Sequence, residues 1–262
     1  MTRRRLDAEL VRRGLVSTTA EAHEAVRSGV VRVRGAADPT VATMVTDDEP
    51  IALAGSEKRF VSRGGEKLAA ALERFAIEPA DRACLDAGAS TGGFTDCLLQ
   101  AGAARVIAVD VGYGQLAWQL RSDLRVTVLE RTNVRDLTPE ILPFLPNLVV
   151  ADLAFMSLRP VAATLCDLSA SEAEFVVLIK PQFEARPADV GNGGVVRDPA
   201  LWKRVVVSVA EAFADESASP IGVMASPLRG PAGNVEFLLH ARKGAAREPI
   251  DVDRAIAEAP LS

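Results

Sequence analysis

Apolar positions follow two different periodicities along the chain. Between Leu6 and Val26 they recur at helical spacing, with a break at Gly14 and a Ser/Thr cap after it, which predicts two short helices. The stretches "VVRVRG" (30–35) and "EPIALA" (49–54) then show the alternation and apolar enrichment of short strands. The first part of the chain therefore predicts a small α+β module.

Beyond the polar connector "GSEKRFVSRGG" (55–65), apolar runs alternate with segments of helix length. Five such runs predict parallel strands that are buried on both faces: 82–88, 104–111, 125–130, 146–153 and 173–180. Two later stretches, 220–228 and 234–242, are expected to pair in antiparallel fashion around a Gly/Pro loop. The second part is thus an α/β domain, and we expect the tail after it to be loosely ordered.

Length and composition fit this division. The 262 residues suffice for one α/β domain and a small module, and 48% apolar with 25% charged residues is typical of a soluble globular protein. The three cysteines and two histidines are isolated in sequence, which predicts reduced structural thiols and no metal site. The basic start lacks an unbroken apolar stretch, and no apolar run approaches about 18 residues, so we expect neither a signal peptide nor a membrane span.

The charge is unevenly distributed along the chain. The net charge is −5, yet residues 1–34 hold eight arginines against four acidic residues, which gives that segment +4. A local basic patch favours nucleic-acid binding, because phosphate contacts depend on charge at the interface rather than on the whole chain. The alternative is a solvated helix face that happens to carry arginines.

The loop "LDAGASTGGFTD" (85–96) follows the first parallel strand and opens a helix near Gly92. Ligands bind at the carboxyl ends of strands in such sheets, and a glycine-rich turn lets the backbone approach them. A dinucleotide fingerprint needs glycine where Ser90 stands, and no G-K-[ST] follows, which excludes a P-loop. Asp86 would repel a pyrophosphate but suits the ammonium group of S-adenosylmethionine, and Asp110 after the second strand could accept ribose hydroxyls. Each feature can also be purely structural; together they favour S-adenosylmethionine over NAD.

The strand ends also constrain the methyl acceptor. Asp152 lies in "VVADLAF", which lacks the prolines of the D-P-P-Y motif usual in amino-group methyltransferases. The cysteines lie inside strand and helix patterns, which argues against the cysteine nucleophile of C5 methylation. Lys180 follows a buried strand and could be a lysine that reaches outward to solvent. Lys67 and Glu236, taken singly, could be surface charges, so only their grouping suggests a site.

Nine blocks in a fixed order resemble the TlyA family of bacterial ribosomal RNA 2′-O-methyltransferases, historically called haemolysins. They are "RLDAELVRRGL", "SRGGEKL", "LDAGASTGGFTD", "DVGYGQL", "LERTNVRDL", "VVADLAFMSL", "KPQFE", "GGVVRDP" and "SPLRGPAGNVEFLL". The resemblance spans residues 3–242. It implies an S4-like RNA-binding domain (1–56), a linker (57–62), an FtsJ-type Rossmann-like methyltransferase domain with a mostly parallel seven-stranded sheet (63–245), and a tail (246–262).

The resemblance also implies an activity, which is transfer of a methyl group from S-adenosylmethionine to cytidine 2′-hydroxyls in small- and large-subunit ribosomal RNA. The implied catalytic set is Lys67, Asp152, Lys180 and Glu236. The cofactor-binding residues expected are Asp86, Gly88, Ala89, Ser90, Thr91, Gly92, Gly93, Phe94, Asp110, Val111, Asn133 and Asp152. The RNA-binding residues expected are Arg3, Arg4, Arg5, Arg12, Arg13, Arg32, Arg34, Arg63, Tyr113, Arg131, Arg135 and Phe155.

The chemistry suits these residue types without a metal. The sulfonium already activates the methyl group, so the enzyme must align the attack and remove a proton from a weakly acidic hydroxyl. A lysine can serve as the base where burial and a second positive charge disfavour its charged form, and we assign this role to Lys180. We expect a cytoplasmic monomer or weak dimer. The alternatives are a non-catalytic ribosome-assembly factor that binds the same RNA and, less favoured, a membrane-active haemolysin.

Overall fold

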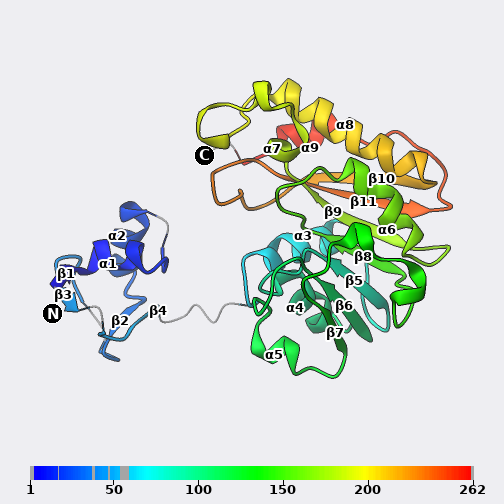
Figure 1. The fold of residues 1–262 in the computed structure, drawn as a ribbon. Coiled ribbons are helices and arrows are strands. Elements are labelled where there is room, and N and C mark those ends of the chain that lie inside the picture. Colours follow the sequence, from blue (N-terminus) through cyan, green and yellow to red (C-terminus); the bar gives the residue numbers. More distant parts are fainter. Residues whose placement is uncertain (1–2, 17, 37–38, 47, 54–58, 261–262) are drawn as a thin grey trace. The chain divides into compact units, whose positions relative to one another are not determined.

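The computed structural model describes residues 3–16, 18–36, 39–46, 48–53 and 59–260. The chain divides into an N-terminal unit, residues 1–59, and a C-terminal unit, residues 60–262 (Figure 1). This boundary lies inside the segment 57–62 that the sequence suggested as a linker, of which residues 57–58 are outside the described residues. Phe60 is buried in the core of the C-terminal unit, and the Val61 N–H donates to Asp96 Oδ2 at 2.7 Å, so residues 60–62 are part of that unit rather than a linker.

The N-terminal unit is a small α+β module, as its two periodicities predict. Its helices are α1 (Leu6–Arg12) and α2 (Thr19–Arg27), and its strands are β1 (Arg3–Arg5), β2 (Val31–Val33), β3 (Met44–Thr46) and β4 (Ile51–Leu53). The predicted strands β2 and β4 pair in antiparallel fashion, whereas the pair β1 and β3 was not predicted. The Thr18 side chain caps α2 by accepting from the Glu21 N–H at 3.1 Å. The S4-like character of the unit stays a prediction.

The C-terminal unit is built on a seven-stranded sheet in the order β10-β11-β9-β8-β5-β6-β7. The strands are β5 (Ala83–Ala87), β6 (Arg105–Val109), β7 (Val126–Leu129), β8 (Leu148–Ala151), β9 (Glu174–Ile179), β10 (Ala218–Ala225) and β11 (Phe237–Lys243). β5 to β9 are parallel, and β11 runs antiparallel to both β9 and β10. The predicted α/β class and mostly parallel sheet are therefore confirmed.

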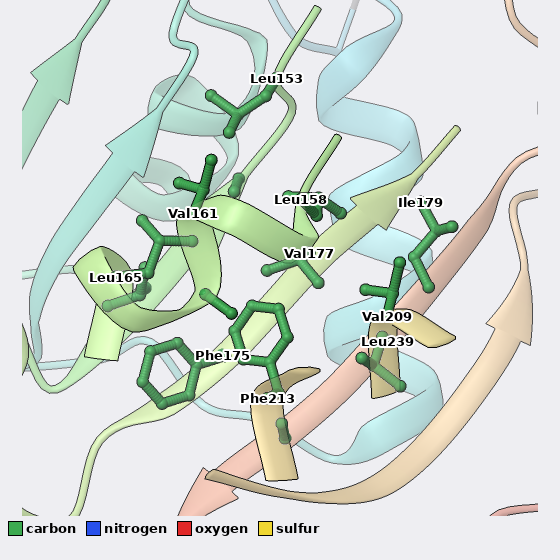
Figure 2. Close-up of a cluster of buried hydrophobic side chains, with 14 of the residues drawn as sticks. Leu153, Leu158, Val161, Leu165, Phe175, Val177, Ile179, Val209, Phe213 and Leu239 are labelled. Atoms are coloured by element: carbon green, nitrogen blue, oxygen red, sulfur yellow. The ribbon is translucent and has the colours of Figure 1, made fainter. Parts of the chain in front are cut away.

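Helices cover both faces of this sheet. They are α3 (Gly64–Phe75), α4 (Gly93–Gln100), α5 (Trp118–Arg121), α6 (Ala162–Asp167), α7 (Pro181–Glu184), α8 (Pro199–Asp215) and α9 (Val252–Ala257). Successive strand residues point to opposite faces: Phe175 and Val177 pack with α6 and α8, whereas Val176 packs with α3 and α4. Figure 2 shows the first of these clusters, where the rings of Phe175 and Phe213 lie 5.7 Å apart. The double burial explains why the strands read as continuous apolar runs.

The segment after the last strand differs from the prediction of a loosely ordered tail. It forms α9, whose residues Val252 and Ala255 are buried in the same cluster as α8. Lys203 of α8 pairs with Asp253 at 2.6 Å, and Arg74 of α3 lies 3.9 Å from Glu258. The tail was missed because six helical residues with two buried positions are too short for a periodic signal.

Candidate active site

Four charged residues reach one edge of the sheet from separate parts of the chain. Lys67 lies in the first turn of α3, and Asp152 and Lys180 directly follow β8 and β9. Glu236 directly precedes β11, whose first residue pairs with the last residue of β9. Because β11 is antiparallel to β9, the residue before β11 and the residue after β9 meet at the same edge. The structure thus brings together the four residues that the sequence grouped.

These residues form two lysine–carboxylate pairs. Lys67 Nζ lies 2.5 Å from Glu236 Oε2, and the side chains are 9% and 1% exposed. Lys180 Nζ lies 2.5 Å from Asp152 Oδ1, with 14% and 24% exposed. The second pair is therefore the more accessible one. Lys180 also lies over the Phe183 ring, 5.9 Å from its centroid.

All four side chains line one cavity of about 290 Å³, which we call the lysine hollow. Its other lining residues come from the start of α3, from the 85–96 loop, from the segment after β8 and from the segment before β11: Ser62, Arg63, Gly64, Gly88, Ala89, Ser90, Thr91, Gly93, Phe94, Ala154, Arg229 and Pro231. Burial raises the pKa of Glu236, while the charge of Lys67 opposes that shift. The hollow therefore holds two lysines and two acidic residues, and burial disfavours the ionised form of Glu236.

The loop after β5 adjoins this hollow because two of its glycines permit close approaches. Gly88 has φ of +86°, and a Cβ there would lie 2.7 Å from the Asp152 carbonyl oxygen. A Cβ on Gly93 would lie 2.9 Å from the Gly65 nitrogen, so the starts of α3 and α4 pack backbone to backbone. The predicted helix start near Gly92 is confirmed, with Gly92 as the N-cap of α4.

Asp86 lies behind this loop rather than on a cavity wall. Its carboxylate is fully buried, and Oδ2 accepts from the Thr95 N–H at 2.9 Å and from Thr95 Oγ1 at 2.6 Å. Oδ1 has no hydrogen-bond partner within the described part of the chain. Burial raises the pKa of Asp86 to about 7, and the charges of Asp152 and Asp110 act in the same direction.

A second cavity, of about 360 Å³, adjoins the first, and we call it the Asp110 hollow. It is lined by Gly88, Ser90, Val109, Asp110, Val111, Gly112, Gln115, Thr132, Asn133, Val134, Asp152, Leu153, Ala154, Phe155 and Met156. The Asp110 carboxylate accepts from the Ser90 N–H at 2.8 Å and from the Gly112 N–H at 2.6 Å, which orients it. Four residues line both hollows: Gly88, Ser90, Asp152 and Ala154.

Most predicted cofactor residues therefore lie on these two cavities. Asp86 and Gly92 do not, because Asp86 is behind the loop and Gly92 packs against Leu116 and Leu120. The prediction missed Ser62, Arg229, Pro231 and Gln115 as lining residues. All four lie within or beside blocks that carry the family resemblance, so block membership was the one signal available.

The predicted RNA-binding residues of the C-terminal unit lie around these openings. Arg63 lines the lysine hollow, and Phe155 lines the Asp110 hollow with 89% of its surface exposed. Tyr113 is exposed, and the Arg131 guanidinium lies over its ring at 4.2 Å. Arg135 is exposed at the rim of the Asp110 hollow, one residue beyond Val134.

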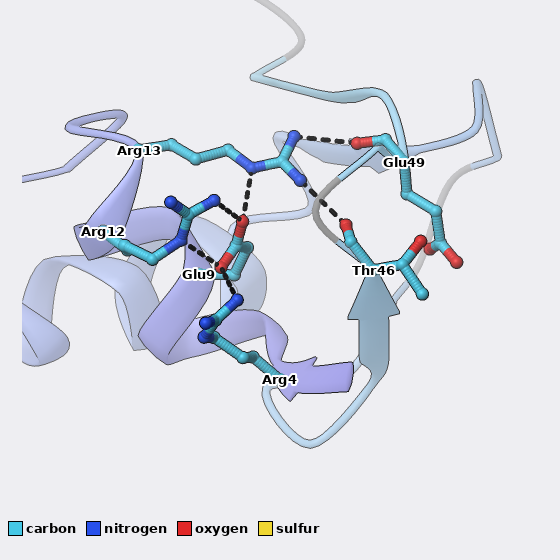
Figure 3. A network of polar contacts seen from close by, with 6 residues as sticks. All are labelled: Arg4, Glu9, Arg12, Arg13, Thr46 and Glu49. Atoms are coloured by element: carbon cyan, nitrogen blue, oxygen red, sulfur yellow. Dashed lines mark hydrogen bonds and ion pairs between the residues drawn. The ribbon is translucent and has the colours of Figure 1, made fainter. Parts of the chain in front are cut away.

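The arginines of the N-terminal unit are organised by acidic side chains. Figure 3 shows Arg4, Arg12 and Arg13 around Glu9, with Arg12 Nε and Arg13 Nε each 2.7 Å from its carboxylate. Arg13 also donates to the carbonyl oxygens of Glu49 and Thr46, at 2.7 and 2.9 Å, so its guanidinium joins α1 to β3. Arg13 thus has a structural role that the sequence prediction did not foresee.

Other arginines of this unit also have partners: Arg5 pairs with Asp7, Arg34 pairs with Glu49, and Arg32 donates to the Gly29 carbonyl.

In the described ranges, no group of three or more His, Cys, Asp or Glu side chains could hold a metal ion. No helix among the described residues is long and apolar enough to cross a membrane.

Comparison with known proteins decides the family. A model of the FtsJ-like methyltransferase family matches residues 60–243. A protein of Mycobacterium tuberculosis, named 16S/23S rRNA (cytidine-2′-O)-methyltransferase TlyA, is 50% identical to this chain, and the match covers 98% of this chain and 99% of that protein. The chain belongs to the TlyA family of FtsJ-like methyltransferases. The predicted family is thereby confirmed.

Two further TlyA-type relatives extend this result. A Campylobacter jejuni protein named 23S rRNA (cytidine-2′-O)-methyltransferase TlyA is 32% identical, with 69% of this chain and 70% of that protein covered. A solved Streptococcus thermophilus structure described as a hemolysin superposes with a TM-score of 0.78 at 36% identity, covering 98% of this chain and 95% of that one. This chain therefore shares its fold with a relative that carries the hemolysin name.

Proposed function

We propose that the protein transfers a methyl group from S-adenosylmethionine to the 2′-hydroxyl of cytidines in ribosomal RNA. One observation carries the proposal. Two lysine–carboxylate pairs line a hollow that shares Gly88, Ser90, Asp152 and Ala154 with a second hollow. A donor in one cavity and an acceptor in the other would meet at Asp152, as an in-line transfer requires.

The Asp110 hollow suits the nucleoside part of the donor. Asp110 is oriented by two backbone N–H groups and can accept ribose hydroxyls, and Asn133 offers an amide at the apolar wall. Gly88 lines both hollows, and its lack of a side chain lets the backbone of the loop contact a ligand at their junction. When bound, S-adenosylmethionine supplies a methyl group that its sulfonium has already activated.

The residues of the lysine hollow then have separate roles. The neutral amine form of Lys180 accepts the proton of the 2′-hydroxyl and becomes an ammonium, which Asp152 then balances at the junction of the two hollows. The deeper pair, Lys67 and Glu236, positions the hydroxyl oxygen and stabilises negative charge that develops on it. The lysine hollow contains no cysteine among its lining residues, and a lysine base fits an oxygen acceptor better than carbon methylation.

RNA binding uses both units in this proposal. Arg4, Arg5, Arg12, Arg32 and Arg34, organised by carboxylates and carbonyls, together with Arg3 contact phosphates from the N-terminal unit. Arg63, Arg131 and Arg135 do so around the two hollows. The exposed rings of Phe155 and Tyr113 stack on nucleotide bases near the target. Action on both ribosomal subunits follows the name of the relative that matches over the whole chain, and the cytoplasm is where ribosomes are available.

The test is mapping of 2′-O-methyl groups on ribosomal RNA after incubation of unmodified 30S and 50S subunits with the purified protein and labelled S-adenosylmethionine. We expect label on a cytidine 2′-hydroxyl in each subunit. RNA binding without any transfer would favour the assembly-factor alternative and contradict the proposal. Leakage of liposomes at the same protein concentration would favour the membrane-active alternative.

A further inference from the structure

An arginine absent from the predicted site lines the lysine hollow. Arg229 lies in the segment between β10 and β11, seven residues before Glu236. Its Nε and Nη2 both donate to the Pro260 carbonyl oxygen, at 2.9 and 2.6 Å, and Nη1 lies 3.5 Å from the Gly233 carbonyl oxygen. The side chain is therefore fixed by a residue 31 positions later in the chain.

The acceptor of these bonds is itself held in place. Pro260 follows α9, which packs on the C-terminal unit through Val252 and Ala255 and through two ion pairs, Lys203 with Asp253 and Arg74 with Glu258. Among the described residues, Arg229 has carbonyl partners and no carboxylate partner, so its charge is not compensated by an ion pair there. In contrast, Arg121 and Arg159 in the same unit pair with carboxylates, which neutralise them.

A nucleotide substrate brings negative charge to this cavity. A 2′-hydroxyl is next to the 3′-phosphate of the same ribose, and the two lysines of the hollow are already balanced by Asp152 and Glu236. Among the lining residues, the remaining cations are Arg63 and Arg229. Guanidinium groups bind phosphate in forked geometry, and two of the five N–H groups of Arg229, one on Nη1 and one on Nη2, are used by neither Pro260 nor Gly233.

We infer that Arg229 binds the phosphodiester next to the target ribose, and that the 246–260 segment positions it for this contact through the Pro260 carbonyl. The inference rests on the proposed function, because it assigns a substrate contact at the same site. Arg229 is a substrate-binding residue under this assignment, and Pro260 is a positioning residue that acts through it.

The experiment compares Arg229→Ala, Arg229→Lys and the wild-type protein in steady-state methylation of ribosomal subunits at several salt concentrations. Arg229→Ala should raise KM for the RNA about tenfold and reduce the slope of log KM against log salt by about 0.7 to 0.9, with the affinity for S-adenosylmethionine unchanged. Arg229→Lys keeps the charge and should restore most of the slope. Arg125→Ala is the matched control, because Arg125 directly precedes β7 and thus lies at the amino ends of the parallel strands, away from the lysine hollow at their carboxyl ends.

A deletion of residues 258–262 tests the positioning role. It removes the Pro260 carbonyl but keeps α9, and Glu258→Gln controls for the lost ion pairs with Arg74 and Arg254. The deletion should raise KM about threefold in the wild-type background and leave KM unchanged in Arg229→Ala, because both changes act on one contact. Equal effects in the two backgrounds would overturn the positioning role.

The outcomes separate the two proposals. A wild-type protein that transfers no methyl group refutes the proposed function. An active wild-type protein with unchanged KM and salt slope in Arg229→Ala refutes the phosphate contact alone, as does an Arg229→Lys variant no better than Arg229→Ala.

Discussion

Two buried glutamates, one in each unit, have pKa values that are shifted in opposite directions. Glu9 of the N-terminal unit is fully buried and accepts from Arg12 and Arg13, with Arg4 at 4.0 Å, and the bond from Arg12 contributes most to lowering its pKa to about 2. Glu236 of the C-terminal unit is almost as buried; burial raises its pKa, and the charges of Lys67 and Lys180 offset this effect only in part.

The difference distinguishes Glu9, whose carboxylate stabilises the fold, from Glu236, whose carboxylate lies in the candidate active site. Three guanidinium groups compensate the desolvation of Glu9, and the result is a rigid joint between α1 and β3. At Glu236 the ionised state is only partly compensated. A change of charge in the hollow during the reaction can therefore shift the protonation equilibrium of Glu236 with a small change in free energy. Under-compensated buried charge is typical of functional sites.

The largest effect is expected at the accessible pair. Lys180→Ala removes the proposed base and should lower kcat about 10³-fold, while S-adenosylmethionine still binds within a few fold, because general bases contribute about 10²- to 10⁴-fold. Lys203→Ala removes an exposed lysine paired with Asp253 and is the control. Single-turnover rates and cofactor titration measure both quantities, and substantial turnover by Lys180→Ala would rule out its role as the base.

A smaller loss of activity should follow Glu236→Gln. The amide keeps the shape but frees the Lys67 ammonium, so we expect kcat to fall about 10- to 100-fold. Stability at pH 8 should be equal or higher, because the raised pKa means that ionised Glu236 opposes folding. Thermal unfolding with parallel rate measurements checks this, and the comparison with Glu9 fails if Glu236→Gln is clearly less stable than the wild type.

Asp86 offers a pH test of the view that the ionised form of a buried, under-compensated carboxyl group opposes folding. Its pKa is raised from 3.8 to about 7, so the stabilising contribution is full below about pH 4 and is lost as the pH rises through 7. The unfolding free energy should decrease by at most about 1.4 kcal/mol per pH unit in this interval, and Asp86→Asn should flatten the decrease. Urea unfolding between pH 4 and 8 measures the slope, and identical slopes would contradict the assignment.

The smallest effect concerns Glu9→Gln. Loss of the carboxylate leaves Arg12 and Arg13 without their ionic partner, and local stability should fall by about 1 to 3 kcal/mol at pH 7. Since the pKa of Glu9 is lowered, its stabilisation is present above about pH 4 and disappears as the pH falls toward 2. Hydrogen exchange of α1 and β3 amides resolves this, and a loss that persists unchanged at low pH would contradict the charge-based account.

Sequence patterns predicted the sheet because its strands are buried on both faces and carry continuous apolar runs. They did not predict β1 or β3, which are three residues long and include the Arg3–Arg5 run, a stretch with no apolar signal. The four charged residues of the lysine hollow were found through the resemblance and not through spacing, since they lie as far apart as Lys67 and Glu236.

The hydrogen bonds of single side chains could not be predicted from the sequence, for a different reason. Arg13 and Arg229 both belong to recognisable blocks, yet the bonds that join them to distant parts of the chain go to backbone carbonyls, and any residue can supply a carbonyl. Such bonds leave no pattern of side chains to detect. The bond between Arg229 and the 246–260 segment could not be predicted for the same reason, because it depends on one main-chain oxygen, that of Pro260.

The antiparallel pairing of β11 with β9 has a consequence for the order in which the site is completed during synthesis. Glu236 reaches Lys180 only after β11 has entered the sheet between β9 and β10. During synthesis from the amino end, the charged set stays incomplete until about nine tenths of the 262 residues have been translated. A nascent chain can thus carry its complete arginine-rich first unit while still attached to a ribosome, without the means to modify it.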